Sequence, residues 1–267
     1  MKRITFLCVA ILFACIVKAQ SQIDNTNIAF LSIGGGFSGA SLEQGFSTAP
    51  IGAFTLDAGY TRFFKYGLGL GVGIRVANMG TKVTFTKLLA EQTGLTDPEG
   101  ERYNLQTFHS DICEKHTIWF FEIPVSMQYR YMFTDKWGIG ASLGLSAMIP
   151  VSARYNTISG KVSKAGYYPE WNVTLHDIDG LFESTDIEQK SGKETATAKF
   201  GLAMDLSVKA IYAIHPRIQL TGGILYSQNL VNLWTDKPAN SLVVQSLEKR
   251  SILPYNISIL IGAEYKF

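Results

Sequence analysis

The stretch YNISILIGAEYKF, residues 255–267, alternates between two kinds of side chain. Every second residue from Tyr255 belongs to a row that is almost wholly apolar and ends in aromatics, whereas the other row is mostly small or polar. Successive side chains of a β-strand point to opposite faces of the sheet. The stretch therefore predicts a strand with one apolar face and one mixed face.

The same alternation recurs along the rest of the chain. The expected strands cover residues 27–37, 51–64, 68–76, 119–133, 137–149, 200–212, 218–226 and 255–267. Each is at least as long as the roughly 9–11 residues that a tilted strand needs to cross a bilayer. Because a sheet in lipid cannot keep open edges, the last strand is expected to pair with the first. The sequence thus predicts an all-β fold, an eight-stranded antiparallel transmembrane β-barrel.

Short and long connections alternate between these strands. The short links lie at 64–66, 134–136 and 215–216, and the long links lie at 40–50, 86–116, 152–198 and 231–251. This alternation is typical of outer-membrane barrels, with short periplasmic turns and long extracellular loops. A soluble β-sandwich is the alternative, but it favours strands of about 5–6 residues and loops of similar length at both ends.

The composition agrees with a membrane barrel and excludes some other classes. The chain has 267 residues and a net charge of +2, which gives no polyelectrolyte signal for nucleic acid. Charged residues make up 17% of the chain, aromatic residues 12%, and 25 residues are glycine. Ordinary soluble domains are about 25% charged, so this composition is unusual for a soluble enzyme.

The first 19 residues have the pattern of a secretory signal peptide. Lys2 and Arg3 precede an apolar run, and Ala19 provides a small residue at the expected cleavage site. The run is shorter than a spanning helix, and the residues around Cys15 fit a lipoprotein signal poorly. We therefore expect a signal peptide at 1–19, an outer-membrane β-barrel at 20–267, and export to the bacterial outer membrane. The mature chain would keep only Cys113, so no internal disulfide is expected.

Aromatic side chains gather where the strands enter the short turns. Such residues form a girdle at the interface between the membrane and water. The predicted membrane-interface aromatics are Tyr60, Tyr66, Tyr131, Phe133, Trp137, Tyr265 and Phe267.

The mixed rows carry charges that should point into the barrel lumen. The predicted lumen charge network consists of Asp57, Arg75, Glu122, Arg130, Asp205, Lys209 and Glu264. An eight-stranded barrel is just wide enough for side chains to fill it, and buried charges must be paired. A paired plug is therefore expected, and a selectivity lining of a pore is the alternative. Lys266 also falls on this row, and Pro124 predicts a local bulge because it cannot donate to the ladder.

One strand-turn-strand element resembles a known family. The segments FEIPV (121–125) and QYRY (128–131), followed by a short turn and Trp137-Gly138, are similar to a pattern of the outer-membrane β-barrel domain family of Gram-negative bacteria. This family includes porin-family proteins and PorT-like barrels. The resemblance implies the location and the fold, and it implies recognition of the final strand by the barrel assembly machinery. It implies no common activity.

Catalytic and metal motifs find little support in the sequence. The G-x-S-x-G match at residues 140–144 lies in the middle of a strand, without the strand-turn-helix that this motif requires. His109, Cys113 and His116 could bind a metal, but their spacing matches no standard zinc pattern. His176 and Asp177 lie in a predicted loop, and the segment 177–180 is expected to form a turn. No metal, no cofactor and no catalytic residue is expected.

The sequence favours a non-enzymatic barrel with a largely occluded lumen, which acts as a structural or interaction platform through its extracellular loops. A narrow pore or a transport- or secretion-accessory barrel is the alternative, and a surface hydrolase is the third possibility. Residues 171–176 alternate and could add a hairpin, giving ten strands and a wider lumen. The expected partners are outer-membrane lipid, the assembly machinery during insertion and an unknown extracellular or envelope partner, but not nucleic acid.

Overall fold

The structure is a computed structural model, and it describes residues 26–42, 44–178, 180–196, 199–248 and 252–267. The predicted signal peptide at 1–19 lies outside these residues. Within the described residues, no helix is long and apolar enough to cross a membrane.

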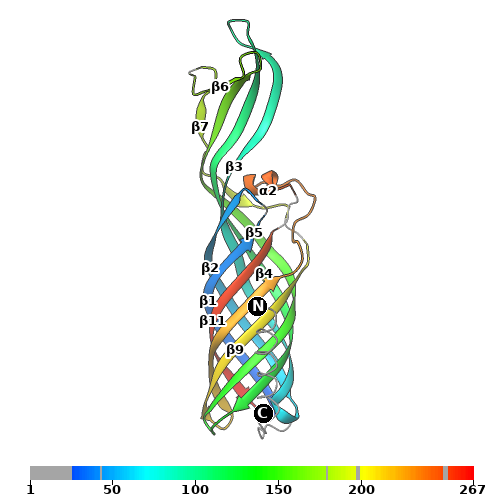
Figure 1. Cartoon of the computed structure of the whole chain (residues 1–267). Coiled ribbons are helices and arrows are strands. Elements are labelled where there is room, and N and C mark those ends of the chain that lie inside the picture. Colours follow the sequence, from blue (N-terminus) through cyan, green and yellow to red (C-terminus); the bar gives the residue numbers. More distant parts are fainter. Residues whose placement is uncertain (1–25, 43, 179, 197–198, 249–251) are drawn as a thin grey trace, which may run out of the picture.

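Eight long strands form a closed ring (Figure 1). They are β1 (Thr26–Ser41), β2 (Phe46–Phe63), β3 (Leu68–Thr96), β4 (Arg102–Met132), β5 (Trp137–Tyr168), β9 (Gly201–His215), β10 (Ile218–Asn229) and β11 (Leu253–Lys266). Each strand pairs antiparallel with the next in this order. The last strand, β11, pairs with β1 and closes the sheet. The predicted eight-stranded antiparallel barrel is confirmed.

The seam between β1 and β11 runs in unbroken register from the pair Ile28 and Lys266 to the pair Ser41 and Leu253. The backbone N–H of Phe267 also donates to the carbonyl of Asn27 at 3.0 Å. Both edges of the sheet are thereby satisfied. A barrel in lipid requires this, because hydrocarbon offers no partner for an open edge.

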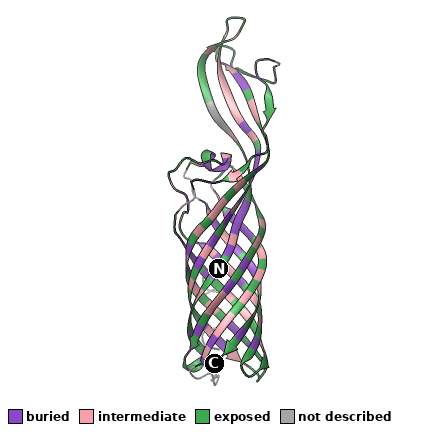
Figure 2. Cartoon of the chain, turned by 180° about the vertical axis from the view of Figure 1, so that it is seen from behind, coloured by how far each residue is buried: buried purple, intermediate pink, exposed green. Residues whose placement is uncertain are grey.

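The two faces of the barrel differ as the alternation predicts. Figure 2 shows exposed and buried positions alternating along the barrel strands. The outward positions are large and apolar; for example, Leu70 is 55% exposed, Val125 56% and Ile259 64%. The inward positions are small or polar, such as Ser146 and Ser258, which are fully buried. A continuous exposed apolar belt around a closed barrel is the surface of a transmembrane barrel.

Three of the strands continue far beyond the others. β3, β4 and β5 contain 29, 31 and 32 residues, and their distal halves leave the barrel as one sheet (Figure 1). Three short strands pair with the distal half of β5: β6 (Val173–His176), β7 (Ser184–Asp186) and β8 (Ser191–Lys193). We call this unit the projecting sheet. Register shifts bend it, for example between Ser110 and Cys113, where Asp111 has a positive φ of 52°.

The projecting sheet corrects the prediction of long loops at 86–116 and 152–198. Both segments are mostly strand, and β3 and β4 are joined by a link of only five residues, 97–101. The sequence criterion was a one-sided apolar row, which these segments lack because neither of their faces meets lipid. The link at 40–50 was also predicted wrongly, since β1 ends at Ser41 and β2 begins at Phe46.

The extra hairpin predicted near Trp171 exists, but it does not enter the barrel. Its strand β6 pairs with the distal residues 165–168 of β5. The membrane part of β5 pairs directly with β9, from Trp137 and Tyr212 to Met148 and Gly201. The barrel therefore has eight strands and not ten.

The bulge predicted at Pro124 is absent. Pro124 pairs with Ser146 in the same register as its neighbours on β4 and β5. On the β3 side, no residues are paired between Val72–Val125 and Arg75–Glu122. The register is the same on both sides of this gap. The missing N–H of proline costs local pairing but does not displace the strand.

Substitution of Gly36 by Ala is expected to weaken the closing seam. A Cβ at Gly36 would lie 1.9 Å from the carbonyl oxygen of Ile257 on β11, so backbone rather than a flexible side chain must move. The refolded fraction, measured by heat-dependent gel mobility, should fall. Gly222→Ala is the matched control, because a Cβ there meets nothing within 4 Å. Equal refolding of the two variants would contradict the prediction.

Candidate functional site: the sealed lumen and its mouth

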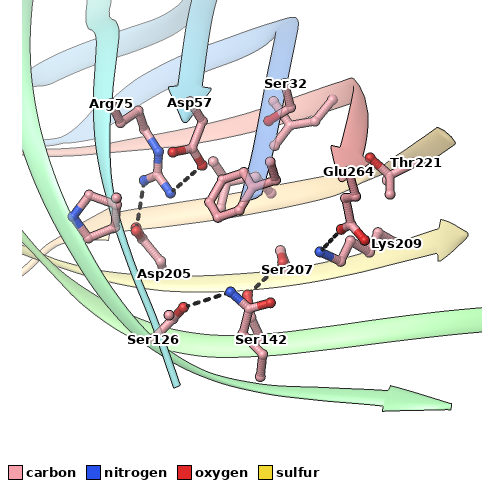
Figure 3. A pocket seen from close by; sticks show the side chains of 18 of the residues that line it. Ser32, Asp57, Arg75, Ser126, Ser142, Asp205, Ser207, Lys209, Thr221 and Glu264 are labelled. Atoms are coloured by element: carbon pink, nitrogen blue, oxygen red, sulfur yellow. Dashed lines mark hydrogen bonds and ion pairs between the residues drawn. The ribbon is translucent and has the colours of Figure 1, made fainter. Parts of the chain in front are cut away.

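Arg75 is the centre of the lumen charge network (Figure 3). Its guanidinium donates to the carboxylates of Asp57 at 3.3 Å, Glu122 at 3.1 Å and Asp205 at 2.7 Å. These four residues come from β2, β3, β4 and β9, so the network ties together opposite walls of the barrel. All four side chains are buried. A charge in such a position is tolerated only because it is paired.

A second cluster lies nearer the short turns. The carboxylate of Glu264 accepts a hydrogen bond from Lys209 at 2.6 Å and forms an ion pair with Arg130. The Arg130 guanidinium also lies over the ring of Phe63, at 5.4 Å from its centroid. All seven predicted lumen charges thus lie in these two clusters. Together the clusters contain four acids and three bases. Lys266, which the alternation also placed on this row, is exposed.

A cavity of about 80 Å³ lies between the two clusters. Its walls include Ser126, Ser142, Ser207 and Thr221, as Figure 3 shows. The hydroxyls of Ser142 and Ser207 lie 2.6 Å apart and share a hydrogen bond. A space of this size and polarity holds a few water molecules and no larger solute. The small residues leave the room that the long charged side chains fill.

The mouth above the lumen is closed by an apolar cluster. Its buried members come from the barrel wall and from the segment between β10 and β11, which we call the mouth segment (residues 230–248). They include Met79, Ile118, Phe120, Met148, Leu233, Trp234, Val243, Val244 and Leu247. The sequence predicted a display loop at 231–251, and the structure instead places much of the described part of it inward as a seal.

Glu114 of β4 holds the mouth segment in place. Its fully buried carboxylate accepts hydrogen bonds from Thr157 at 2.8 Å, the Ser241 hydroxyl at 2.7 Å and the backbone N–H of Val243 at 3.0 Å. The last two belong to the start of the short helix α2 (Leu242–Ser246), above the membrane belt. Burial raises the pKa of Glu114, but these donors together with His116 outweigh that effect and lower the pKa to about 2.

A second buried carboxylate, Glu194, binds the same segment from the other side. It accepts hydrogen bonds from the backbone N–H groups of Asn240 at 3.2 Å and Ser241 at 2.9 Å, and from that of Ala196 at 2.8 Å. Residues 240–243 are thus held between two carboxylates that come from β4 and from the residue after β8. The mouth segment is therefore a hydrogen-bonded part of the fold rather than a loosely held loop.

The predicted interface aromatics lie at the short-turn end of the barrel. Tyr60, Tyr66, Phe133, Trp137, Tyr265 and Phe267 are exposed, and Tyr131 is half-buried. Neighbours pack ring to ring; for example, Tyr60 and Phe267 have centroids 6.0 Å apart. A second aromatic pair, Phe54 and Trp119, lies toward the other rim with centroids 6.3 Å apart. This pair was not among the predicted interface aromatics, because that prediction covered only the strand ends near the short turns.

The histidines lie on strands, which corrects their prediction as loop residues. His109 and His116 are buried in β4, and His176 is exposed on β6. Seven residues of extended strand separate His109 from His116 by roughly 20 Å, so they cannot share a metal ion. Among the described residues, no group of three or more His, Cys, Asp or Glu side chains is arranged to hold a metal. Ser142 of the G-x-S-x-G match lies on β5 and shares a hydrogen bond with Ser207 of β9.

Comparison with known proteins finds only weak similarity, and this similarity is to outer-membrane proteins. No protein-family model and no curated protein sequence matches the chain. Neisserial surface protein A is 11% identical, with 90% of this chain and 97% of that one covered and a TM-score of 0.38. The outer membrane protein OprG from Pseudomonas aeruginosa is 12% identical, with 94% and 99% covered and a TM-score of 0.36. The outer membrane protease OmpT from Escherichia coli is 9% identical, with 94% and 99% covered and a TM-score of 0.33. Similarity this weak carries no argument about activity, and the barrel is defined by its own closed pairing.

Replacement of Arg75 by Met should strongly destabilise the barrel. It would leave three buried carboxylates without their shared cation, which costs about 3–5 kcal/mol in comparable cases. Denaturant unfolding of the refolded protein, followed by tryptophan fluorescence, measures the loss. Neutralising Asp57, Glu122 and Asp205 as amides in the same chain should restore part of it. Arg217→Met, at an exposed position, is the control, and an equal loss in both variants would contradict the central role of Arg75.

Replacement of Glu114 by Gln should release the mouth segment. At pH 7.5, chymotrypsin should cleave the variant after Trp234 faster than it cleaves the wild type, while Glu170→Gln, an exposed change, should leave the rate unaltered.

The same contact predicts a dependence on pH. Because the folded pKa of Glu114 lies below its ordinary value of 4.5, its stabilisation is complete above that value and is lost as the pH falls toward about 2. Pepsin cleavage of the wild-type mouth segment should therefore accelerate between these pH values. A profile that is identical in the wild type and in Glu114→Gln would argue against Glu114 as the holding group.

Proposed function

We propose that this protein is a non-enzymatic barrel of the bacterial outer membrane whose sealed lumen supports a projecting sheet that binds an extracellular or envelope partner. The observation that carries this proposal is the continuity of β3, β4 and β5. Each runs unbroken from the membrane belt into the projecting sheet (Figure 1). The barrel anchors that sheet rigidly and holds it at a distance from the lipid surface.

The packing of the lumen favours a platform function over a channel function. The two ion clusters fill the membrane part, and the apolar cluster and the mouth segment close its outer end. A pore needs a continuous wet path, usually with one sign of charge along it. Here the charges are paired across the lumen, and the Arg75 cluster and the apolar cluster lie between the cavity of about 80 Å³ and the outer end.

The tip of the projecting sheet has features that are typical of a protein-binding surface. Trp171 is 51% exposed and lies parallel to the ring of Tyr168, with centroids 5.0 Å apart. Tyr168 also stacks on Tyr103 at 5.6 Å and donates a hydrogen bond to Asp97 at 3.0 Å. Phe182 is fully buried behind these rings. An exposed indole on such a fixed support is a common centre of protein interfaces.

A narrow pore or transport-accessory barrel is the second candidate. The observation that favours it is the lumen cavity itself, which a movement of the mouth segment together with the Arg75 cluster would connect to the outside. The seal is non-covalent and depends on the two carboxylates Glu114 and Glu194, so this candidate requires a trigger that loosens them.

Planar-bilayer conductance of the refolded full chain separates the two candidates. The platform predicts a silent bilayer with protein that shows heat-dependent gel mobility. Steady and uniform channel openings would overturn the platform in favour of the pore. As a second arm, a photo-cross-linking amino acid replaces Trp171 in living cells. Protein adducts should form there and should be absent when the same substitution is made at Trp137 in the membrane interface. Adducts at neither position would contradict a partner at the tip.

A further inference from the structure

Four basic side chains gather on the outward face of the projecting sheet where it leaves the barrel. They are Lys82, Lys115, Arg154 and Lys193, and we call them the basic patch. They come from four strands, β3, β4, β5 and β8, and all four are exposed. The neighbours of each in sequence are more buried, so the pleat directs the four cations to the same outer face.

The strand register places these cations next to one another. Lys82 pairs directly with Lys115, and Arg154 pairs directly with Lys193. Lys115 pairs with Asn156, which makes Arg154 its diagonal neighbour. Directly paired residues have Cβ atoms about 4.5–5.5 Å apart, and diagonal neighbours lie about 7–8 Å apart. Like charges opposite each other destabilise a sheet, so an anion bound among them would relieve the repulsion.

The surrounding residues do not supply that anion. The other cross-strand partners of Lys82, Lys115 and Arg154 are Ala49, Asn156 and Thr117, which are neutral. The adjacent acids Glu114 and Glu194 point inward to the mouth segment. Within the part of the chain that the structure describes, none of the four cations has an acidic side chain within 4.0 Å. An anion that relieves this repulsion would therefore come from outside the protein.

The height of the basic patch suggests the source of that charge. Trp119 and Val151 are the last exposed apolar residues of the belt on β4 and β5. Lys115 is four residues beyond Trp119, and Arg154 is three residues beyond Val151. At about 3.3 Å per residue along a strand tilted by roughly 40°, these cations lie about 8–10 Å above the belt. Lipid head groups occupy roughly the first 5–7 Å above the hydrocarbon, which the long Lys and Arg side chains can reach.

We propose that the basic patch binds the phosphate groups of an outer-leaflet lipid of the lipid A type. The acyl chains of that lipid would lie against the apolar belt below the patch. This inference rests on the proposed outer-membrane location. A phosphate accepts hydrogen bonds from several Lys and Arg side chains at once, which fits four cations within one small area. The bound lipid would fix the base of the projecting sheet to the membrane surface.

Native mass spectrometry of the refolded full chain in neutral detergent, titrated with diphosphorylated lipid A, tests the proposal. The variant carries Lys82→Gln, Lys115→Gln, Arg154→Gln and Lys193→Gln. The control removes four other exposed charges, through Arg102→Gln, Lys136→Gln, Lys164→Gln and Lys190→Gln. Lipid A affinity should fall about tenfold or more in the patch variant and stay within about twofold of the wild type in the control. Monophosphoryl lipid A should bind the wild type more weakly than the diphosphorylated form.

Equal affinity of the patch variant and the wild type would overturn the proposal. So would inorganic pyrophosphate that binds as tightly as lipid A, because that result indicates a site for a free anion. Heat-dependent gel mobility confirms that each variant is folded. If the fourfold variant does not fold, Lys82→Gln with Lys115→Gln and Arg154→Gln with Lys193→Gln are measured as separate pairs. The platform itself is tested by conductance and cross-linking, which do not depend on this lipid, so the two failures are distinguishable.

Discussion

Backbone hydrogen bonding in lipid is the constraint on which the rest of this structure depends. Hydrocarbon offers no partner for an N–H or a C=O group, so a sheet in the membrane must return to its own first strand. The seam between β1 and β11 meets this requirement along fourteen residue pairs, from Ile28 and Lys266 to Ser41 and Leu253. Closure with eight strands then fixes a lumen so narrow that its side chains must fit and neutralise one another. The pairing of Arg75 with three carboxylates follows from that confinement.

Alternation of the pleat organises the chain beyond the membrane as well. In the barrel it separates an apolar outer row from a polar inner row. Past the belt there is no lipid on the outside, and at the level of the mouth the same alternation separates two acids from two bases. On β4, Glu114 points inward and Lys115 outward, and around the end of β8, Lys193 points outward and Glu194 inward. The inward acids hold the mouth segment, and the outward bases form the basic patch.

The architecture divides the tasks among three levels. The lumen provides rigidity through paired ions, the mouth segment excludes solvent above it, and the projecting sheet carries the exposed surface. Because β3, β4 and β5 belong to both the barrel and the projecting sheet, no flexible linker separates anchor from surface. Such continuity lowers the conformational entropy that a partner would otherwise have to restrict on binding.

The alternating pattern is sufficient to predict the barrel, its eight strands and the residues that face its lumen, because successive side chains of each strand meet lipid and lumen in turn. Asp57 and Arg75 could be assigned to one face from spacing alone. Spacing does not predict which of these charges pair with one another. Arg75 and Asp205 are 130 residues apart in the chain, and only closure of the barrel brings them together.

The arrangement of the chain beyond the apolar belt could not be predicted from the sequence pattern and is seen only in the folded protein. The distal halves of β3, β4 and β5 have no one-sided apolar row, so their strand character depends on hydrogen bonds to neighbouring strands. The inward fold of the mouth segment depends on Glu114 and Glu194, two carboxylates that are distant from it in sequence. Local pattern reports the environment of a side chain, whereas the contacts that seal the mouth and assemble the basic patch arise only from the register between strands.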